Sequence, residues 1–295
     1  QELPALAAVC RAQGVPLLVD NAHGAYLRFL PQNCHPIAQG AAMCCDSAHK
    51  TLPVVTGGAY LHLAHDAPVQ DEAAVRGALA LFGSTSPSYL ILQSLDACNA
   101  VLAGDYPRRL VQCCAALEGL RRSLNKTAAA RQCPVPLAVA GAQQEPMKLT
   151  LDAAALGCTG TALADALRRA QLECEYADPR YVVLMFTPEN PPQDYTRLQT
   201  VLEQLLAAVP AGLLRPENRA GEFAALQQQA AQRCTIRQAV LGAQVRVPVH
   251  KALGRVCAMP TVSCPPAIPV AVSGEEITPA AIVLMQRYGI EELSV

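Results

Sequence analysis

Residues 41–50 read AAMCCDSAHK, an apolar run that passes directly into the polar segment SAHK. A second stretch, VPLLVDNAHG at 15–24, has the same form, because its apolar part ends at Asp20 and His23 follows. Short apolar runs of this kind are typical of buried parallel strands, whose carboxyl ends open on ligand sites in α/β sheets. We therefore predict a parallel sheet with Asp20 and residues 47–50 at one edge.

The flanking sequence supports alternating helices and strands. A helix is predicted before the first strand, ending at Gly14, and a third strand is predicted at 57–64. The pattern is helical from about 70 to 124, where STSP at 84–87 separates two helices and Ser86 is the expected N-cap of the second. Helix and strand repeated with short loops indicate an α/β fold.

The later sequence predicts further domains. Strands at 147–153 and 181–188 with helices at 160–170 and 193–208 indicate a small α/β domain. A valine-rich and turn-rich region then ends in a closing helix. The predicted domains are 1–105, 106–215 and 216–295.

Composition narrows the class of protein. The chain has 295 residues, of which 52% are hydrophobic and 16% charged, with a net charge of −1 at pH 7. This balance offers no bulk positive charge for a nucleic-acid partner. No apolar stretch reaches the ~20 residues needed to cross a bilayer, and no secretory leader stands at the N-terminus. We expect a soluble protein with no membrane partner.

The thirteen cysteines point to a reducing compartment, since their number is odd and the chain is long. We predict a cytoplasmic protein in which the pairs Cys44-Cys45 and Cys113-Cys114 serve as small buried hydrophobes. No C-x-x-C spacing occurs, and His62 and His65 are expected on opposite faces of a strand, so no metal site is predicted.

The residue types around the two polar segments suit pyridoxal phosphate (PLP) chemistry. Such catalysis needs a lysine amine that holds the aldehyde as a Schiff base and a carboxylate that keeps the pyridine nitrogen protonated. Lys50 and Asp20 are candidates for these roles, and Ser47 and His49 are candidate phosphate ligands. Each residue alone also has an ordinary interpretation, such as a turn carboxylate or a solvated lysine.

The segments DNAHGAYLRFL, HPIAQGAAMCCDSAHKTLPVVTGGAYLHL and STSPSYLILQSLDA together resemble the PLP-binding domain of the Orn/Lys/Arg decarboxylase family. GRVCAMPTVSCPPAIPVAVSGEEIT resembles the C-terminal domain of the same family. The resemblance implies the later part of a fold-type-I, aspartate aminotransferase-like PLP domain, then a small α/β domain and a C-terminal α+β domain. It also implies the short form of the family, with a chain that begins inside the PLP domain and is N-terminally truncated.

The resemblance also assigns roles to individual residues. Catalytic roles fall to Lys50, Asp20 and His49, with His49 or Lys50 returning a proton to the α-carbon. A serine or threonine of the STSPSY stretch is expected to reach the phosphate of a neighbouring subunit in a homodimer. The implied cofactor-binding residues are Asp20 at the pyridinium nitrogen, Ala22 on the ring face, His23 near the phenolic oxygen, Ser47 and His49 at the phosphate, Lys50 as the attachment site, and Ser84 or Thr85 across the dimer.

The activity that the resemblance implies is PLP-dependent decarboxylation of lysine, ornithine or arginine, a step of polyamine biosynthesis. Three positions depart from the family pattern: Asn21 replaces an acidic residue, Ala267 replaces a glycine, and SGE replaces PGE at 273–275, which puts a substrate role for Glu275 in doubt.

Two alternatives stay open. One is another fold-type-I activity, an aminotransferase or a lyase, for which Arg180 is a candidate carboxylate ligand. The other is a truncated, non-catalytic fragment that retains the motifs by descent.

Overall fold

A computed structural model of the chain describes residues 2–69, 71–83, 86–141, 144–209, 230–259, 262–264 and 268–295. The chain divides into two compact units, the first made of residues 1–122, 140–149 and 185–199 and the second of residues 123–139, 150–184 and 200–295. The predicted division into three domains stays a prediction, and its boundary at 215 lies outside the described residues.

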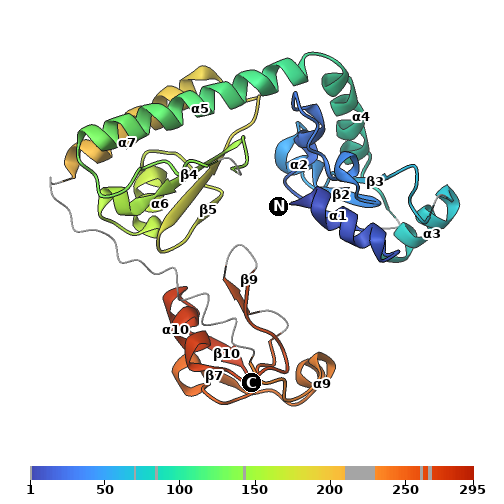
Figure 1. The fold of residues 1–295 in the computed structure, drawn as a ribbon. Helices are drawn as coiled ribbons and strands as arrows, with labels where there is room; N and C mark the ends of the chain where they lie inside the picture. The colour runs from blue at the N-terminus through green and yellow to red at the C-terminus, as the bar shows by residue number, and fades with distance from the viewer. Residues whose placement is uncertain are drawn as a thin grey trace. The chain divides into compact units, whose positions relative to one another are not determined.

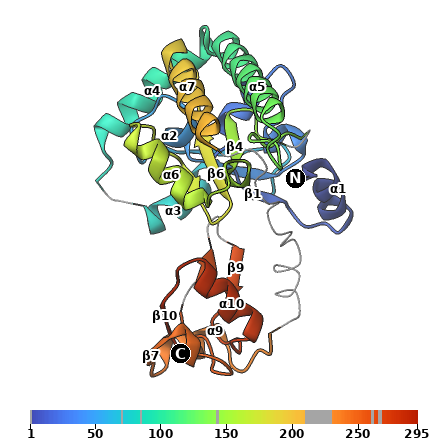
Figure 2. The same ribbon diagram turned by 90° about the vertical axis from the view of Figure 1, so that its left-hand side faces the viewer.

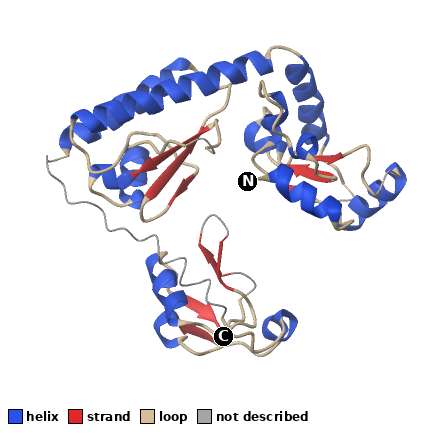
Figure 3. Ribbon diagram, in the orientation of Figure 1, coloured by secondary structure: helices blue, strands red, loops and turns tan. Residues whose placement is uncertain are grey.

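A three-stranded sheet organises the first unit (Figure 3). Its order is β1 (Leu18–Asp20), β2 (Met43–Asp46), β3 (Tyr60–Leu63). The parallel pairing of β1 with β2 confirms the prediction for the first two strands, and β3 runs antiparallel to β2. The fold is a mixture of helices and sheets, as the α/β prediction required.

Burial in this sheet differs from the prediction in two places. Leu18 is 61% exposed, so the prediction that the first strand is buried was wrong: Leu18 lies on the face of the sheet on which Asp20 and Cys45 are also exposed. Cys44 and Cys113 are buried as predicted, but Cys114 is half-buried and Cys45 is exposed. Successive residues of a strand face opposite sides, so Cys44 and Cys45 cannot both point into one core.

Helices of the first unit follow the predicted order (Figure 1). The cap of the helix after the STSP break is Ser88, whose hydroxyl accepts from the backbone N–H of Ile91, so the prediction of Ser86 was wrong by two residues. The helical elements are α1 (Leu3–Ala12), η1 (Ala25–Phe29), η2 (Pro36–Gln39), α2 (Ala48–Thr51), α3 (Glu72–Phe82) and α4 (Tyr89–Ala103).

The apolar core of the first unit anchors the short helix α2. Ala48 and Leu52 are buried in the same cluster as Tyr26 and Tyr106, and the Tyr106 hydroxyl donates to the backbone carbonyl of Thr51 (3.4 Å). With these inward positions fixed, His49 and Lys50 are left half-buried.

Two long helices lie side by side, α5 (Tyr106–Ala130) and α7 (Pro192–Ala208) (Figures 1 and 2). Within the first unit, the Tyr195 hydroxyl of α7 donates to the Cys113 sulfur of α5. Within the second unit, the Arg131 side chain donates to the backbone carbonyl of Ala207. The associated sheet has the order β4 (Lys148–Asp152), β6 (Tyr181–Met185), β5 (Tyr176–Ala177), and is accompanied by η3 (Ala153–Leu156) and α6 (Gly160–Arg169).

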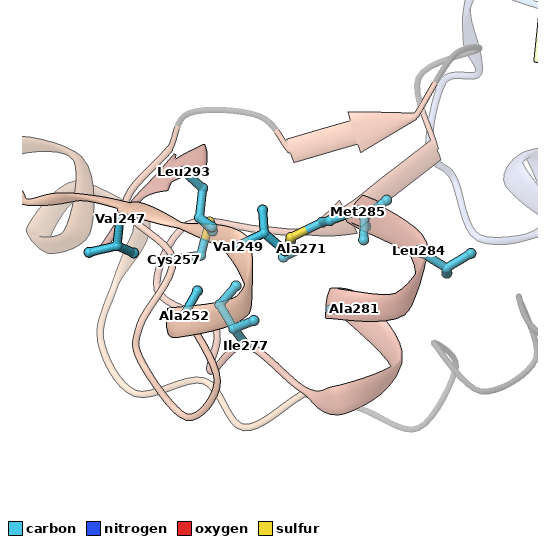
Figure 4. Close-up of a cluster of buried hydrophobic side chains, with 11 residues drawn as sticks. Val247, Val249, Ala252, Cys257, Ala271, Ile277, Ala281, Leu284, Met285 and Leu293 are labelled. Carbon is cyan, nitrogen blue, oxygen red and sulfur yellow. The ribbon is translucent and has the colours of Figure 1, made fainter. Parts of the chain in front are cut away.

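The C-terminal part of the second unit has its own apolar core (Figure 4). Met285 and Leu293 are fully buried in it, and β7 pairs antiparallel with β10. Its elements are α9 (Ile236–Leu241), β7 (Arg246–Pro248), η4 (Val249–Lys251), β8 (Val262–Cys264), β9 (Ile268–Ala271), α10 (Pro279–Arg287) and β10 (Glu292–Ser294).

Two glycine-to-alanine substitutions should have opposite effects on stability. A Cβ at Gly160 would lie 2.2 Å from the carbonyl oxygen of Asp178, a backbone atom that cannot move aside, so Gly160→Ala should destabilise the protein by roughly 1–3 kcal/mol. Gly119 lies inside α5 with nothing near its Cβ position, so Gly119→Ala should stabilise by roughly 0.5–1 kcal/mol. Urea unfolding of both variants checks the pair, and equal shifts of the same sign would contradict the packing at Gly160.

Candidate active site

The two polar segments leave the sheet at the same edge. Asp20 pairs with Cys45 in the register of β1 and β2, and the backbone N–H of Asn21 donates to the carbonyl of Cys45 (2.8 Å). The turn at 21–24 and the helix α2 therefore start next to each other, as the sequence predicted.

Lys50 and His23 are the predicted site residues that meet directly. The Lys50 Nζ lies 3.4 Å from Nε2 of His23, and both side chains are half-buried. A protonated lysine can only donate, so this contact uses the lone pair of His23 Nε2. The D-x-x-H and S-x-H-K segments, 27 residues apart, are thus joined through their functional side chains.

His49 is held by the glycine pair that follows the SAHK segment. Its Nδ1 lies 2.9 Å from the carbonyl oxygen of Gly58, and because a carbonyl can only accept, Nδ1 carries the proton. Nε2 is then the ring atom that can bind a ligand. Gly58 cannot be replaced cheaply, since a Cβ there would lie 2.3 Å from Cγ1 of Val54.

The remaining predicted residues vary in how they are placed. Ser47 is the N-cap residue of α2, yet its side chain makes no capping bond, which leaves the hydroxyl for another partner. Asp20 ends β1 and is exposed, and Ala22 is half-buried in the turn that follows. Ser84 and Thr85 lie outside the described residues, as does the departure at Ala267.

Arg180 is already bound by a carboxylate. It donates from Nε (3.1 Å) and Nη2 (2.7 Å) to Oδ2 of Asp152, which is buried. These bonds with Asp152 raise the pKa of Arg180. The bidentate pair identifies Arg180 as a structural cation of the second unit and weakens its case as a substrate ligand.

Glu275 likewise makes a hydrogen bond within its own turn. Its carboxylate accepts from the backbone N–H of Val272 (2.8 Å), and Gly274 in that turn has a φ of +92°. The Ser273 hydroxyl is buried and donates to the carbonyl of Met259. The serine that departs from the family pattern thus takes part in a local bond.

Sequence reasoning missed a buried polar cluster beside the SAHK segment. The Asp46 carboxylate is bonded by Nε2 of His35 (3.0 Å), Nε2 of His62 (3.0 Å) and Nδ2 of Asn21 (2.8 Å). Burial by itself raises the pKa of Asp46, but the bonds from these three side chains outweigh it and hold the pKa well below its usual range. The sequence did contain a sign of this cluster, namely an aspartate inside an apolar strand, because a buried carboxylate requires hydrogen-bond partners.

Asp46, His35 and His62 also line a cavity of about 600 Å³ in the first unit. The other lining residues are mostly apolar, among them Phe29 and Leu102. Among the described residues, those lining this cavity do not include Asp20, His23 or Lys50, so the cavity and the Lys50 contact are separate features.

Solved structures with the same fold include two lysine decarboxylases. The Francisella novicida lysine decarboxylase superposes with a TM-score of 0.68 at 18% identity, covering 94% of this chain and 51% of that one. The constitutive lysine decarboxylase of E. coli gives 0.67 at 18% identity, covering 95% and 52%. The chain is thus an α/β protein of fold type I, the fold of pyridoxal phosphate enzymes, with a lysine at the edge of its sheet.

The sequence profile described as "Orn/Lys/Arg decarboxylase, major domain" matches residues 6–144. Over residues 6–144, just under half of its length, the chain is similar to the Orn/Lys/Arg decarboxylase family. Arginine decarboxylase of Bacillus subtilis is 27% identical over 288 residues, covering 94% of this chain and 56% of that protein. The uncharacterized protein YaaO of the same organism is 34% identical over 178 residues, covering 58% and 35%.

The chain therefore spans about half the length of the arginine decarboxylase and of the solved lysine decarboxylases that it matches. Among the helices that the structure describes, none has the length and apolarity required to cross a membrane.

The neighbouring thiols Cys44 and Cys45 should differ in reactivity. Burial, followed by the charge of Asp46, raises the pKa of Cys44, so less of it is thiolate at a given pH, whereas Cys45 is exposed. At pH 8, iodoacetamide should label Cys45 at least about tenfold faster than Cys44. Peptide mass spectrometry of timed samples measures both rates, and equal labelling in the folded protein would contradict the burial of Cys44.

Proposed function

We propose that this chain provides the cofactor lysine, Lys50, of a PLP-dependent decarboxylase that acts on a basic amino acid. The single observation that supports this most is the 3.4 Å contact between Lys50 and His23, which joins the two motifs shared with the decarboxylase family.

The residues present suit the chemical groups of the cofactor. Lys50 provides an amine for the aldehyde, and Asp20 provides a carboxylate for the pyridine nitrogen at the edge of the same sheet. The Ser47 hydroxyl, which makes no capping bond, would donate to the phosphate, and Nε2 of His49 would donate to it with the imidazole protonated. Ala22 would pack against the ring, with His23 near its phenolic oxygen. When bound, PLP supplies an electron-accepting ring for the electrons released as carbon dioxide leaves.

The contact with His23 gives Lys50 a proton acceptor. An ammonium group cannot attack an aldehyde, so Lys50 must lose a proton before it can hold the cofactor. The Nε2 lone pair of His23 is the neighbouring base for that proton. Lys50 or His49 would return a proton to the α-carbon, and the bond from His49 Nδ1 to Gly58 fixes Nε2 as the atom His49 would use.

The names of the relatives support the proposed substrate class. Relatives that cover more than nine-tenths of the chain are named arginine decarboxylases, and two solved structures with the same fold are named lysine decarboxylases, which supports lysine, ornithine or arginine. The binding of Arg180 by Asp152 favours decarboxylation over transamination, because it engages the candidate ligand for a transaminase substrate in a structural ion pair.

A homodimer in the cytoplasm is the proposed setting. Exposed apolar side chains on α3 and α4, such as Phe82 (92% exposed) and Tyr89 (83%), support association with a second copy. The described cysteines are free thiols, which suits a reducing compartment.

Lys50 should be the attachment site for PLP. Treatment with PLP and then borohydride should leave a stable pyridoxyl group on Lys50, and Lys50→Ala should lose at least about 90% of it, because the substitution removes the amine that lies 3.4 Å from Nε2 of His23. Peptide mass spectrometry locates the group. Lys251→Ala, which removes an exposed lysine of the second unit, is the matched control and should keep the label on Lys50.

The reaction type should be carbon dioxide release. With PLP and carboxyl-labelled lysine, ornithine or arginine, the protein should release labelled carbon dioxide at least about tenfold faster than it forms keto acid, since its candidate transaminase arginine is occupied. Lys50→Ala should abolish the release. Formation of keto acid without carbon dioxide would instead favour an aminotransferase.

A further inference from the structure

Asp46 adjoins both polar segments of the candidate site, since it precedes SAHK in the chain and contacts Asn21. It ends β2 directly before the SAHK segment, and its carboxylate is almost fully buried, with 2% of its side chain exposed. Besides the bonds from Asn21, His35 and His62, it accepts a weaker one from the Cys44 thiol (3.4 Å). A buried charge with several donors is rigidly held, because moving it would leave those donors unpaired.

Proton positions distinguish this cluster from a metal site. Ligand atoms of His35, Cys44 and Asp46 lie within 4.8 Å of one another, a spacing that a metal ion could bridge. However, Nδ1 of His35 accepts from the backbone N–H of Ile37, so the ring proton is on Nε2 and points to Asp46. Metal binding through Nε2 would place the ring proton against the Ile37 N–H. The arrangement is therefore that of a carboxylate surrounded by donors.

Asn21 connects this carboxylate to the other motif. Its backbone N–H donates to Cys45 and its side-chain amide donates to Asp46, so two bonds tie the end of β1 to the end of β2. Gly24 leaves room for this amide, since a Cβ on Gly24 would clash with the side chain of Asn21. His23 belongs to the turn between Asn21 and Gly24, and Lys50 to the helix after Asp46.

We propose that Asp46 is a positioning residue of the cofactor site: through Asn21 it sets the separation of the His23 turn from the Lys50 helix. This inference rests on the proposed function for its relevance to PLP, but the geometry it describes exists without the cofactor. The proposed geometry requires that, of positions 21 and 46, one carries a carboxylate and the other an amide.

Exchange of the two groups provides the test. Asp46→Asn places an amide against the donors of Asn21, His35 and His62, and Asn21→Asp places two carboxylates side by side. Each single variant should slow borohydride-trapped labelling of Lys50 by PLP at least about tenfold, which corresponds to the loss of one bond to a charged group. The double variant Asn21→Asp/Asp46→Asn restores a carboxylate facing an amide and should recover to within about threefold of the wild type.

Controls separate positioning from loss of folding. Asp66→Asn makes the same chemical change at an exposed aspartate and should leave the rate within about twofold. Asn21→Ala removes the hydrogen bond from position 21 to Asp46 and leaves the bonds from His35 and His62 in place. This variant should also slow labelling, and it tests the proposal even where Asp46→Asn fails to fold. Rescue by the double variant is a result that general destabilisation would not give.

A second measurement needs no cofactor. In ¹⁵N-labelled protein without PLP, the imidazole signals should show a proton on Nε2 of His35 and His62, and the Nε2 signal of His23 should shift in Asp46→Asn but not in Asp66→Asn. Failure of wild-type protein to take up PLP, with these signals as expected, would overturn the proposed function alone. A folded Asp46→Asn or Asn21→Ala variant with unchanged His23 signal and wild-type labelling would overturn the positioning role.

Discussion

A charge buried between strands governs the arrangement of this protein's candidate site. A carboxylate taken out of water is unfavourable unless its oxygens receive hydrogen bonds, so Asp46 fixes every group that donates to it. Its donors come from the turn after β1, from the cap of η2 and from β3. One side chain thus ties together three segments that the chain order separates, and two of them adjoin the residues proposed to hold the cofactor.

The alternation of side chains in β2 separates two environments. Cys44 and Asp46 point to the face that carries His62, whereas Cys45 points to the exposed face shared with Asp20. The buried polar cluster and the end of β1 therefore lie on opposite sides of one thin sheet. Apolar anchoring of α2 through Ala48 and Leu52 then directs Lys50 toward His23 and away from the core.

Local sequence was sufficient for the elements that apolar runs and turn residues define. The strands ending at Asp20 and Asp46 form and pair in parallel, as their pattern predicted, so that Asp20 and the segment 47–50 leave the sheet at one edge. The contact of Lys50 with His23 was not part of that prediction. The cluster around Asp46 was not predictable in this way, because its partners His35 and His62 are 11 and 16 residues away and meet it only through strand register and loop path. The exposure of Leu18 was missed for a similar reason, since whether a face of a sheet is covered depends on which other segments pack against it.

The departure at position 21 becomes intelligible once Asp46 is included. The Nδ2 of Asn21 lies 2.8 Å from Oδ1 of Asp46, so an acidic side chain there would place two carboxylates in contact inside a poorly hydrated site. One of them would have to take up a proton, and the donors that hold Asp46 would lose a charged acceptor. An amide at 21 avoids this conflict and contributes a donor. Asn21 is therefore best understood as the complement of Asp46: the two positions together require one negative charge, and a change at either should be judged with the other.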